Sequence, residues 1–369
     1  MKKDYPASEQ HPVTHYAQLL TPNYNAARQV SNWLLVGVFM IVIQVVLGGI
    51  TRLTESGLSI TEWKPITGAL PPLNDVAWQA EFDKYKGTDQ FKYVHQQFSL
   101  SDFKFIFFWE WFHRVWARLM GMVFIIGFIY FLVKRKFRRQ MVLPMAILFV
   151  LGALQGAIGW IMVKSGLVPE KYYVGHVELT THLLAALGLL CYTLWFALQL
   201  RVGTQQMVVL PNKHKQLKWL LGLLVIQLAY GGFMAGLKAA VVATSWPDIN
   251  GQIIPAKAWD TEMGWASLVN SSLMIHLIHR SLGYIILALS CYWAFSGASS
   301  FKTSALVAKL RVTFLCVVSL QVLLGILTVV NATFTNRLVW LGVTHQFVAM
   351  ILLMVVVSLL YTVRNKKMA

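Results

Sequence analysis

Eight stretches of the chain are long and apolar enough to cross a lipid bilayer, which takes roughly 20 apolar residues in a helix. They cover residues 33–50, 109–133, 141–163, 177–199, 217–237, 272–295, 309–330 and 343–363. No alternation of apolar and polar residues, as expected for β-strands, competes with a helical reading of these stretches. The pattern therefore predicts an all-α integral membrane protein with eight transmembrane helices.

The composition supports the same class of protein. Hydrophobic residues make up 57% of the 369 residues and charged residues 13%, about half of what soluble domains carry. Disordered, disulfide-rich and nucleic-acid-binding proteins fit this composition poorly, so we expect a lipid bilayer and no nucleic acid as partner. Cys191, Cys291 and Cys316 lie inside apolar stretches and resemble small buried hydrophobic residues.

The basic residues between the apolar stretches predict the orientation. Fifteen Lys and Arg residues gather around the connections after the second, fourth, sixth and eighth stretches, against five in the short loops of the other side. Because cytoplasmic loops are enriched in Lys and Arg, both termini should be cytoplasmic. Asp4 and Glu9 disfavour a mitochondrial transit peptide, so a bacterial plasma membrane is the simplest location for this multi-pass chain.

Short motifs recur between the two halves of the chain. The pairs are Gly48-Gly49 with Gly231-Gly232, Trp63 and Pro65 with Trp246-Pro247, His113-Arg114 with His279-Arg280, Gln155 and Gly159 with Gln321 and Gly325, and Thr181-His182 with Thr344-His345. Each half holds four helices, so both halves enter the membrane from the same side and are related by an axis along the membrane normal. We expect two pseudo-symmetric four-helix bundles.

This repeat divides the chain into four parts. They are a cytoplasmic segment at 1–32, a first bundle at 33–200 with a long outer loop at 51–104, a cytoplasmic linker at 201–216, and a second bundle at 217–369.

Four histidines related by the repeat lie in the second, fourth, sixth and eighth stretches, close to the outer face. They are His113, His182, His279 and His345. An ionisable residue at membrane depth indicates function, and two imidazoles from two helices of one bundle suit axial ligation of a haem. Zinc would need three or four close ligands, and copper would need Cys or Met nearby. His276, three residues before His279, is the alternative ligand, although a packed or supporting role suits it better.

Together with the first outer loop, these histidines resemble the haem A synthase family. The loop motifs are GGITRLT at 48–54, GLSI at 57–60, WKP at 63–65 and EFDKY at 81–85. This stretch is similar to the mitochondrial and α-proteobacterial branch, and the resemblance covers nearly the whole chain. Another branch of the family carries a cysteine pair in this loop, which is absent here.

The resemblance implies an oxidoreductase for cytochrome oxidase biogenesis. It would convert the C8 methyl group of haem O to the formyl group of haem A through a hydroxymethyl intermediate. It implies that His279 and His345 ligate the iron of a haem b cofactor, while His113 and His182 bracket the substrate haem. A haem O synthase and a haem–copper oxidase are the implied partners, and a homo-oligomer is left open.

The two halves differ in the carboxylates beside their histidines. Glu110 and Glu178 each lie one turn before a histidine of the first half, whereas the second half has His276 and Leu341 at the matching positions. Because methyl oxidation releases protons, a nearby base is useful, and Glu110 is our candidate. The alternative for Glu110 is a favourable position near a helix N-terminus. The role of Glu178 stays open. The asymmetry predicts chemistry in the first half and electron relay in the second.

Two arginines follow candidate ligands directly. We expect Arg114 and Arg280 to pair with haem propionates, through charge-assisted hydrogen bonds. Arg52 and Arg118 also stand near the outer face, where either a propionate or the membrane interface would suit them.

Two other classes of protein share parts of this pattern. A di-haem b-type cytochrome that only passes electrons would use the same four histidines but would not need Glu110 or the long outer loop. A transporter can be built from parallel repeats, although its polar groups usually gather at mid-membrane rather than near one face.

The orientation is testable with fused reporters. A reporter placed after Lys136 should be cytoplasmic, and one placed near Asn74 should be periplasmic, because the basic loops stay inside. Accessibility of the reporter to membrane-impermeant reagents measures this. The reverse result would move both groups of histidines to the cytoplasmic side.

Overall fold

The computed structural model describes residues 15–62 and 67–366 of the chain, so the motif residues Trp63 and Pro65 lie outside the described part. Eight long helices account for most of it: α2 (Tyr24–Leu53), α5 (Leu100–Val133), α6 (Arg139–Gly166), α7 (His176–Arg201), α8 (Pro211–Gly236), α10 (Ser272–Phe295), α11 (Ala305–Val330) and α12 (Thr335–Thr362). All eight are long and apolar enough to cross a membrane. The expected all-α membrane protein with eight spans is confirmed.

Several helices extend beyond the apolar stretches that predicted them. Helix α2 begins at Tyr24 rather than at residue 33, and the side chain of Asn23 accepts a hydrogen bond from the amide of Ala26. Helix α5 begins at Leu100 rather than at residue 109. Ser99 and Asp102 form a reciprocal capping box at this N-terminus. Apolarity marks only the part of a helix inside the bilayer, whereas the ends in water are fixed by capping groups.

The long loop between α2 and α5 contains helices of its own. They are η1 (Thr67–Ala69), α3 (Asp75–Lys86) and α4 (Asp89–Tyr93). The rings of Phe82 and Tyr85 stack on Phe103 of α5, with centroids 5.1 and 5.3 Å apart. This small aromatic core holds the loop against the start of α5.

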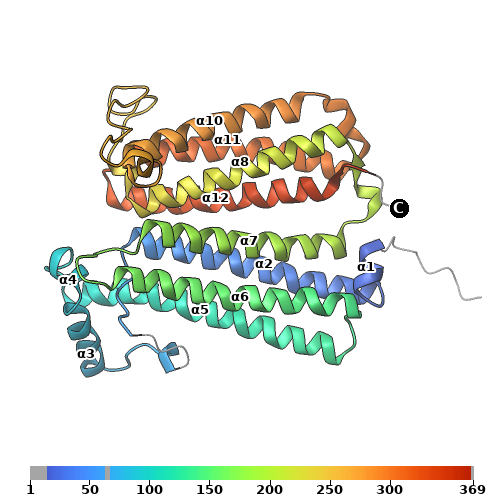
Figure 1. Ribbon diagram of the computed structural model, residues 1–369. Helices are drawn as coiled ribbons and strands as arrows, with labels where there is room; N and C mark the ends of the chain where they lie inside the picture. Colours follow the sequence, from blue (N-terminus) through green and yellow to red (C-terminus); the bar gives the residue numbers. More distant parts are fainter. Residues whose placement is uncertain (1–14, 63–66, 367–369) are drawn as a thin grey trace, which may run out of the picture.

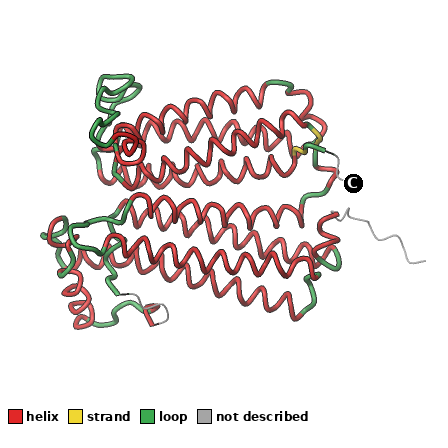
Figure 2. The backbone as a smooth tube through the Cα atoms, in the orientation of Figure 1, coloured by secondary structure: helices red, strands yellow, loops and turns green. Residues whose placement is uncertain are grey.

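The remaining elements are short. They are α1 (His15–Leu20), η2 (Thr204–Gln206), β1 (Val208–Val209), η3 (Ala239–Val241), η4 (Gly264–Ala266), α9 (Ser267–Asn270), η5 (Ala298–Thr303) and β2 (Val363–Arg364). Strands β1 and β2 pair in parallel and tie the linker between α7 and α8 to the end of α12 (Figure 2).

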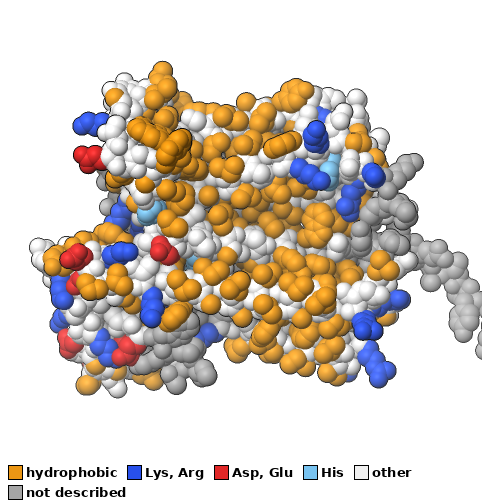
Figure 3. Space-filling view, in the orientation of Figure 1, with side chains coloured by type: hydrophobic (Ala, Val, Ile, Leu, Met, Phe, Trp, Pro, Cys, Tyr) orange, Lys and Arg blue, Asp and Glu red, His pale blue; other side chains and the backbone are white. Residues whose placement is uncertain are grey.

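The long helices form two layers that follow the order of the chain. Figure 1 shows α2, α5, α6 and α7 on one side and α8, α10, α11 and α12 on the other, with both described ends of the chain at one end of the molecule. The opposite end, which carries α3 and α4, is called the loop end below. A broad apolar surface separates the two ends, and on the face shown in Figure 3 the acidic side chains lie at the loop end.

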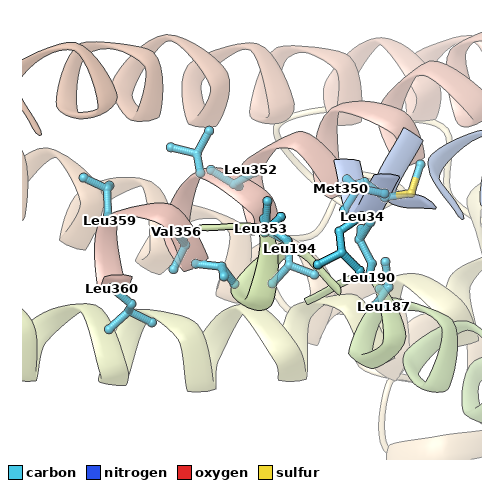
Figure 4. Packing of buried hydrophobic residues seen from close by; sticks show 14 of the residues in the cluster. Leu34, Leu187, Leu190, Leu194, Met350, Leu352, Leu353, Val356, Leu359 and Leu360 are labelled. Atoms are coloured by element: carbon cyan, nitrogen blue, oxygen red, sulfur yellow. The ribbon is translucent and has the colours of Figure 1, made fainter. Parts of the chain in front are cut away.

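The two layers meet where α7 packs on α8 and α2 packs on α12. Figure 4 shows leucines of α2 and α7 packed against α12. Close approach depends on glycine: a Cβ at Gly232 of α8 would lie 2.6 Å from Thr180 Oγ1, and one at Gly49 of α2 would meet the side chain of Gln346. Such tight packing stabilises helices in a bilayer, where lipid tails remove most of the hydrophobic driving force.

A glycine substitution tests this contact. Gly232→Ala should lower the stability of the protein by about 1–3 kcal/mol, because the added methyl group overlaps the buried Thr180 side chain. Gly222→Ala in the same helix is the control, since a Cβ there meets no atom within 4 Å. Thermal unfolding in detergent compares the two variants. Equal melting temperatures would show that the contact between the layers tolerates the extra group.

Candidate haem site

A single large cavity connects the two layers of helices. Its volume is about 1780 Å³, and all four predicted histidines line it: His113 from α5, His182 from α7, His279 from α10 and His345 from α12. Each of these histidines is more than 60 positions from the next in the sequence, and the fold brings them together around the same cavity. The wall between the histidines is mostly aliphatic side chains and glycine, as a flat apolar macrocycle requires.

The spacing of His279 and His345 fits a shared iron. Their ring centroids are 6.4 Å apart, and the ring planes meet at 76°. Two metal–nitrogen bonds of about 2 Å each, extended by about 1.2 Å from each nitrogen to its ring centre, give roughly 6.4 Å. In the described residues, no group of three or more His, Cys, Asp and Glu side chains is placed to hold a metal ion. Two imidazoles without a third ligand are what a haem iron uses.

The alternative residues point elsewhere. His276 is fully buried and does not line the cavity, whereas His279 on the same helix does. Glu178 lies in the first turn of α7, with its carboxylate beside Gly175, and it does not line the cavity either. Both residues are therefore poorer candidates than His279 and Glu110.

Glu110 lines the cavity and is nearly inaccessible to solvent, with 3% of its surface exposed. Its Oε2 accepts hydrogen bonds from Ser59 Oγ at 2.7 Å and from the Ile60 amide at 2.8 Å, and its Oε1 pairs with Arg114 Nη2 at 2.6 Å. The carboxylate therefore fastens the start of the long outer loop to α5, one turn from His113.

The two repeat-related arginines make the same kind of contact. Arg114 donates to the carbonyl oxygens of Ile60 and Glu62, and Arg280 donates to those of Ala243, Ser245 and Asp248.

Both arginines line the cavity, but Arg114 already makes two hydrogen bonds, and Arg280 three, to the loop that follows the preceding helix. The pairing with propionates expected from the sequence therefore competes with these loop contacts.

The loop end of the cavity carries an excess of positive charge. Besides Arg114 and Arg280, its lining includes Arg52, Arg118, Lys164 and Lys238, against the acidic residues Glu55, Glu62 and Glu110. Two propionate groups at the edge of a macrocycle would be stabilised by such a rim.

One polar network at this rim joins the two halves of the chain. Lys238, which follows α8, forms an ion pair with Glu55, which follows α2, and the ammonium lies 3.9 Å from the centre of the Tyr173 ring. His95 Nε2 lies 3.3 Å from the same carboxylate, and its Nδ1 lies 2.6 Å from Tyr85 Oη. Burial alone would raise the pKa of Glu55, but hydrogen bonds from His95 and Lys238 lower it to about 2.

Comparison with known proteins identifies the family of the chain. Residues 31–357 match the family model of the cytochrome oxidase assembly protein, COX15-CtaA. The chain belongs to the COX15-CtaA family. A "Heme A synthase" of Flavobacterium psychrophilum is 40% identical over 87% of this chain and 94% of its own length. Two further proteins of the same name are each 38% identical to this chain. The one from Paracoccus denitrificans matches over 82% of this chain and 80% of its own length, and the one from a Caulobacter species matches over 92% of this chain and 97% of its own length.

In this COX15-CtaA chain, four glutamines that line the cavity form a set that the sequence alone did not predict as part of the site. Each is a glutamine four residues before a glycine, and the pairs are Gln44 with Gly48, Gln155 with Gly159, Gln227 with Gly231, and Gln321 with Gly325. The second and fourth pairs are visible as motifs that recur between the two halves, whereas Gly48 and Gly231 recur as part of a glycine pair that does not draw attention to the glutamine four residues before it. Each glutamine contacts one of the four histidines.

Proposed function

We propose that the protein is a haem A synthase, which oxidises the C8 methyl group of haem O to a formyl group through a hydroxymethyl intermediate. One observation carries the proposal: a single cavity holds two pairs of imidazoles, and only the first pair has a cavity-lining carboxylate one turn away. The "Heme A synthase" relatives, aligned over most of their length, support the same activity.

The first half, residues 33–200, takes the substrate haem, and the second half, residues 217–369, holds haem b. Helices α5 and α6 pack less closely than their counterparts α10 and α11. Gly152 and Gly156 line the cavity on α6, where α11 presents Val318 and Val322. The first half therefore offers more room, which haem O needs because it carries a long isoprenoid chain that haem b lacks.

Haem b would be held by His279 and His345, and when bound it supplies one-electron transfer. The aliphatic wall keeps water away from this pair, which stabilises neutral imidazoles as ligands. Arg280 anchors the 243–248 segment at the rim and, through its Nε–H group, which has no hydrogen-bond partner, is our candidate partner for a haem b propionate.

In the first half, His113 and His182 bracket the substrate haem. Oxidation of the alcohol to the aldehyde releases two protons and two electrons. The electrons would pass one at a time through haem b of the second half to an external electron acceptor, and Glu110 is our candidate acceptor for one of the two protons. Its contacts with Ser59 and Ile60 keep the outer loop closed over the same place. Arg114 keeps the carboxylate oriented and is our candidate partner for a substrate propionate.

The loop end faces the outside of a bacterial plasma membrane, with both termini in the cytoplasm. The basic loops at the termini end support this orientation. A haem O synthase would supply the substrate, and assembly of a haem–copper oxidase would use the product.

Pigment extraction tests the activity. The chain is co-expressed with a haem O synthase in a bacterial host without haem A, and the haems are separated by chromatography. We expect haem A and its alcohol precursor beside haem b. Haem O returned unchanged, with haem b present, would instead identify a di-haem electron carrier.

The ligands of haem b are tested by alanine variants. His279→Ala and His345→Ala should each remove the low-spin bis-histidine signal of the resident haem, because each variant deletes one of the two imidazoles of the second half that line the cavity. His276→Ala is the matched control, since its ring does not line the cavity. Electron paramagnetic resonance of the purified protein measures the signal. Loss of the signal only in His276→Ala would reverse the assignment.

Two variants separate proton transfer by Glu110 from its hold on the loop. Glu110→Gln should reduce haem A formation on the order of 10²–10⁴-fold, as expected for loss of a general base, with haem b content unchanged. Ser59→Ala removes one loop contact and keeps the carboxylate, so it should lose far less. Equal losses in the two variants would make Glu110 a loop anchor only, and loss of haem b would make it structural.

A further inference from the structure

Each cavity histidine is touched by a glutamine from the long helix that precedes its own. Gln44 Nε2 lies 2.9 Å from His113 Nε2, and Gln155 Nε2 lies 3.1 Å from His182 Nδ1. The same amide groups also donate to the backbone carbonyl oxygens of these two histidines, at 3.2 and 2.9 Å.

The second half repeats this contact. Gln227 Nε2 lies 3.4 Å from His279 Nε2 and donates to the His279 carbonyl oxygen at 3.0 Å. Gln321 Nε2 lies 3.3 Å from His345 Nε2. Four glutamines on α2, α6, α8 and α11 thus serve four histidines on α5, α7, α10 and α12.

A glycine one turn after each glutamine makes room for the ring. A Cβ at Gly159 would lie 2.8 Å from His182 Cε1, and one at Gly325 would lie 3.0 Å from His345 Cε1. At Gly48 and Gly231 the corresponding distances are 3.2 and 3.4 Å. Each imidazole is therefore contacted by a glutamine on one turn of the neighbouring helix and packs against a glycine on the next turn.

The amide oxygen of each glutamine is a hydrogen-bond acceptor without a donor. The Oε1 atoms of all four glutamines are buried without a hydrogen-bond partner, and so is Nδ1 of three of the histidines, His113, His279 and His345. A neutral imidazole that ligates a metal through one nitrogen carries its proton on the other, and that N–H needs an acceptor. A half-turn of the amide brings Oε1 to the ring in place of Nε2. The amide then gives up its bond to the histidine carbonyl oxygen, which keeps its own bond within the helix, and the side chain shifts so that the two oxygens do not meet.

We propose that the four Gln-x-x-x-Gly pairs are positioning residues for the haem-ligating histidines. The amide oxygen of each glutamine accepts a hydrogen bond from the ring N–H group that faces it. The other ring nitrogen is then unprotonated and available to ligate iron. Each glycine leaves the space that the ring needs in this orientation. This inference rests on the proposed function, because it takes the four histidines as haem ligands.

The fourfold occurrence argues against chance packing. A buried amide without a role would tend to be replaced by an apolar residue of similar size, because burying an unpaired amide oxygen is costly. Instead the same residue occurs in every one of the four helices that face a histidine, at the same distance from its glycine.

Resident haem b provides a readout that does not depend on turnover. Gln227→Leu and Gln321→Leu remove the acceptor, so haem b should bind roughly 10–100-fold more weakly and its midpoint potential should rise. Gln227→Glu keeps an acceptor and strengthens it, so haem should be retained while the potential falls. Spectral titration with haem b, potentiometry and electron paramagnetic resonance of the full-length protein measure these changes.

The first half supplies matched controls. Gln44→Leu and Gln155→Leu should leave the haem b spectrum and potential unchanged, and should instead weaken binding of added haem O. If the Leu variants of Gln227 and Gln321 keep the haem b affinity, potential and spectrum of the unmodified protein, the glutamine inference is overturned. An unmodified protein that lacks a low-spin haem would overturn the proposed function itself and the inference with it.

Discussion

A polar group within the hydrocarbon layer of a membrane has no water to bond, so the protein must supply its partners from its own backbone and side chains. The interior of this chain is organised around that constraint. Four imidazoles, four glutamine amides, Glu110 and two arginines are all placed where the helices of the two layers surround one cavity. The buried carboxylate has three donors, whereas the imidazoles and amides keep atoms without partners. The imidazole nitrogens are the atoms that a haem iron would use, and the amide oxygens are the acceptors that we propose for the imidazole N–H groups.

The glycine pair of each half shows how packing and the site depend on each other. The first glycine, Gly48 or Gly231, faces a histidine ring of its own half. The second, Gly49 or Gly232, faces a side chain of the other half. Two adjacent residues on a helix point about 100° apart, so one dipeptide can serve the cavity and the contact between layers together. The position of the ligands is thereby tied to the docking of the two halves.

The differences between the halves lie in what surrounds the shared frame. Glu110 sits on the cavity wall of the first half, and the second half has the buried His276 at the matching position. Gly152 and Gly156 of the first half correspond to Val318 and Val322 of the second half in the repeat. A repeated scaffold thus holds two similar pockets, while a few substitutions give one of them a carboxylate and extra room. The Lys238–Glu55 ion pair then joins the two halves at the rim.

The sequence by itself determined the number of spans, the helical class, the repeat and the four histidines, because bilayer thickness and the cost of burying polar groups leave a strong pattern in one dimension. It did not determine where α2 and α5 begin, since those ends lie in water and depend on capping side chains. Only the tertiary structure decided that Glu110 and Arg114 hold the outer loop and that His279 rather than His276 faces the cavity. It also showed that the four glutamines, each four residues before a glycine, all meet a histidine. Such choices depend on how neighbouring helices rotate about their axes, and that rotation is set by packing between residues far apart in the chain.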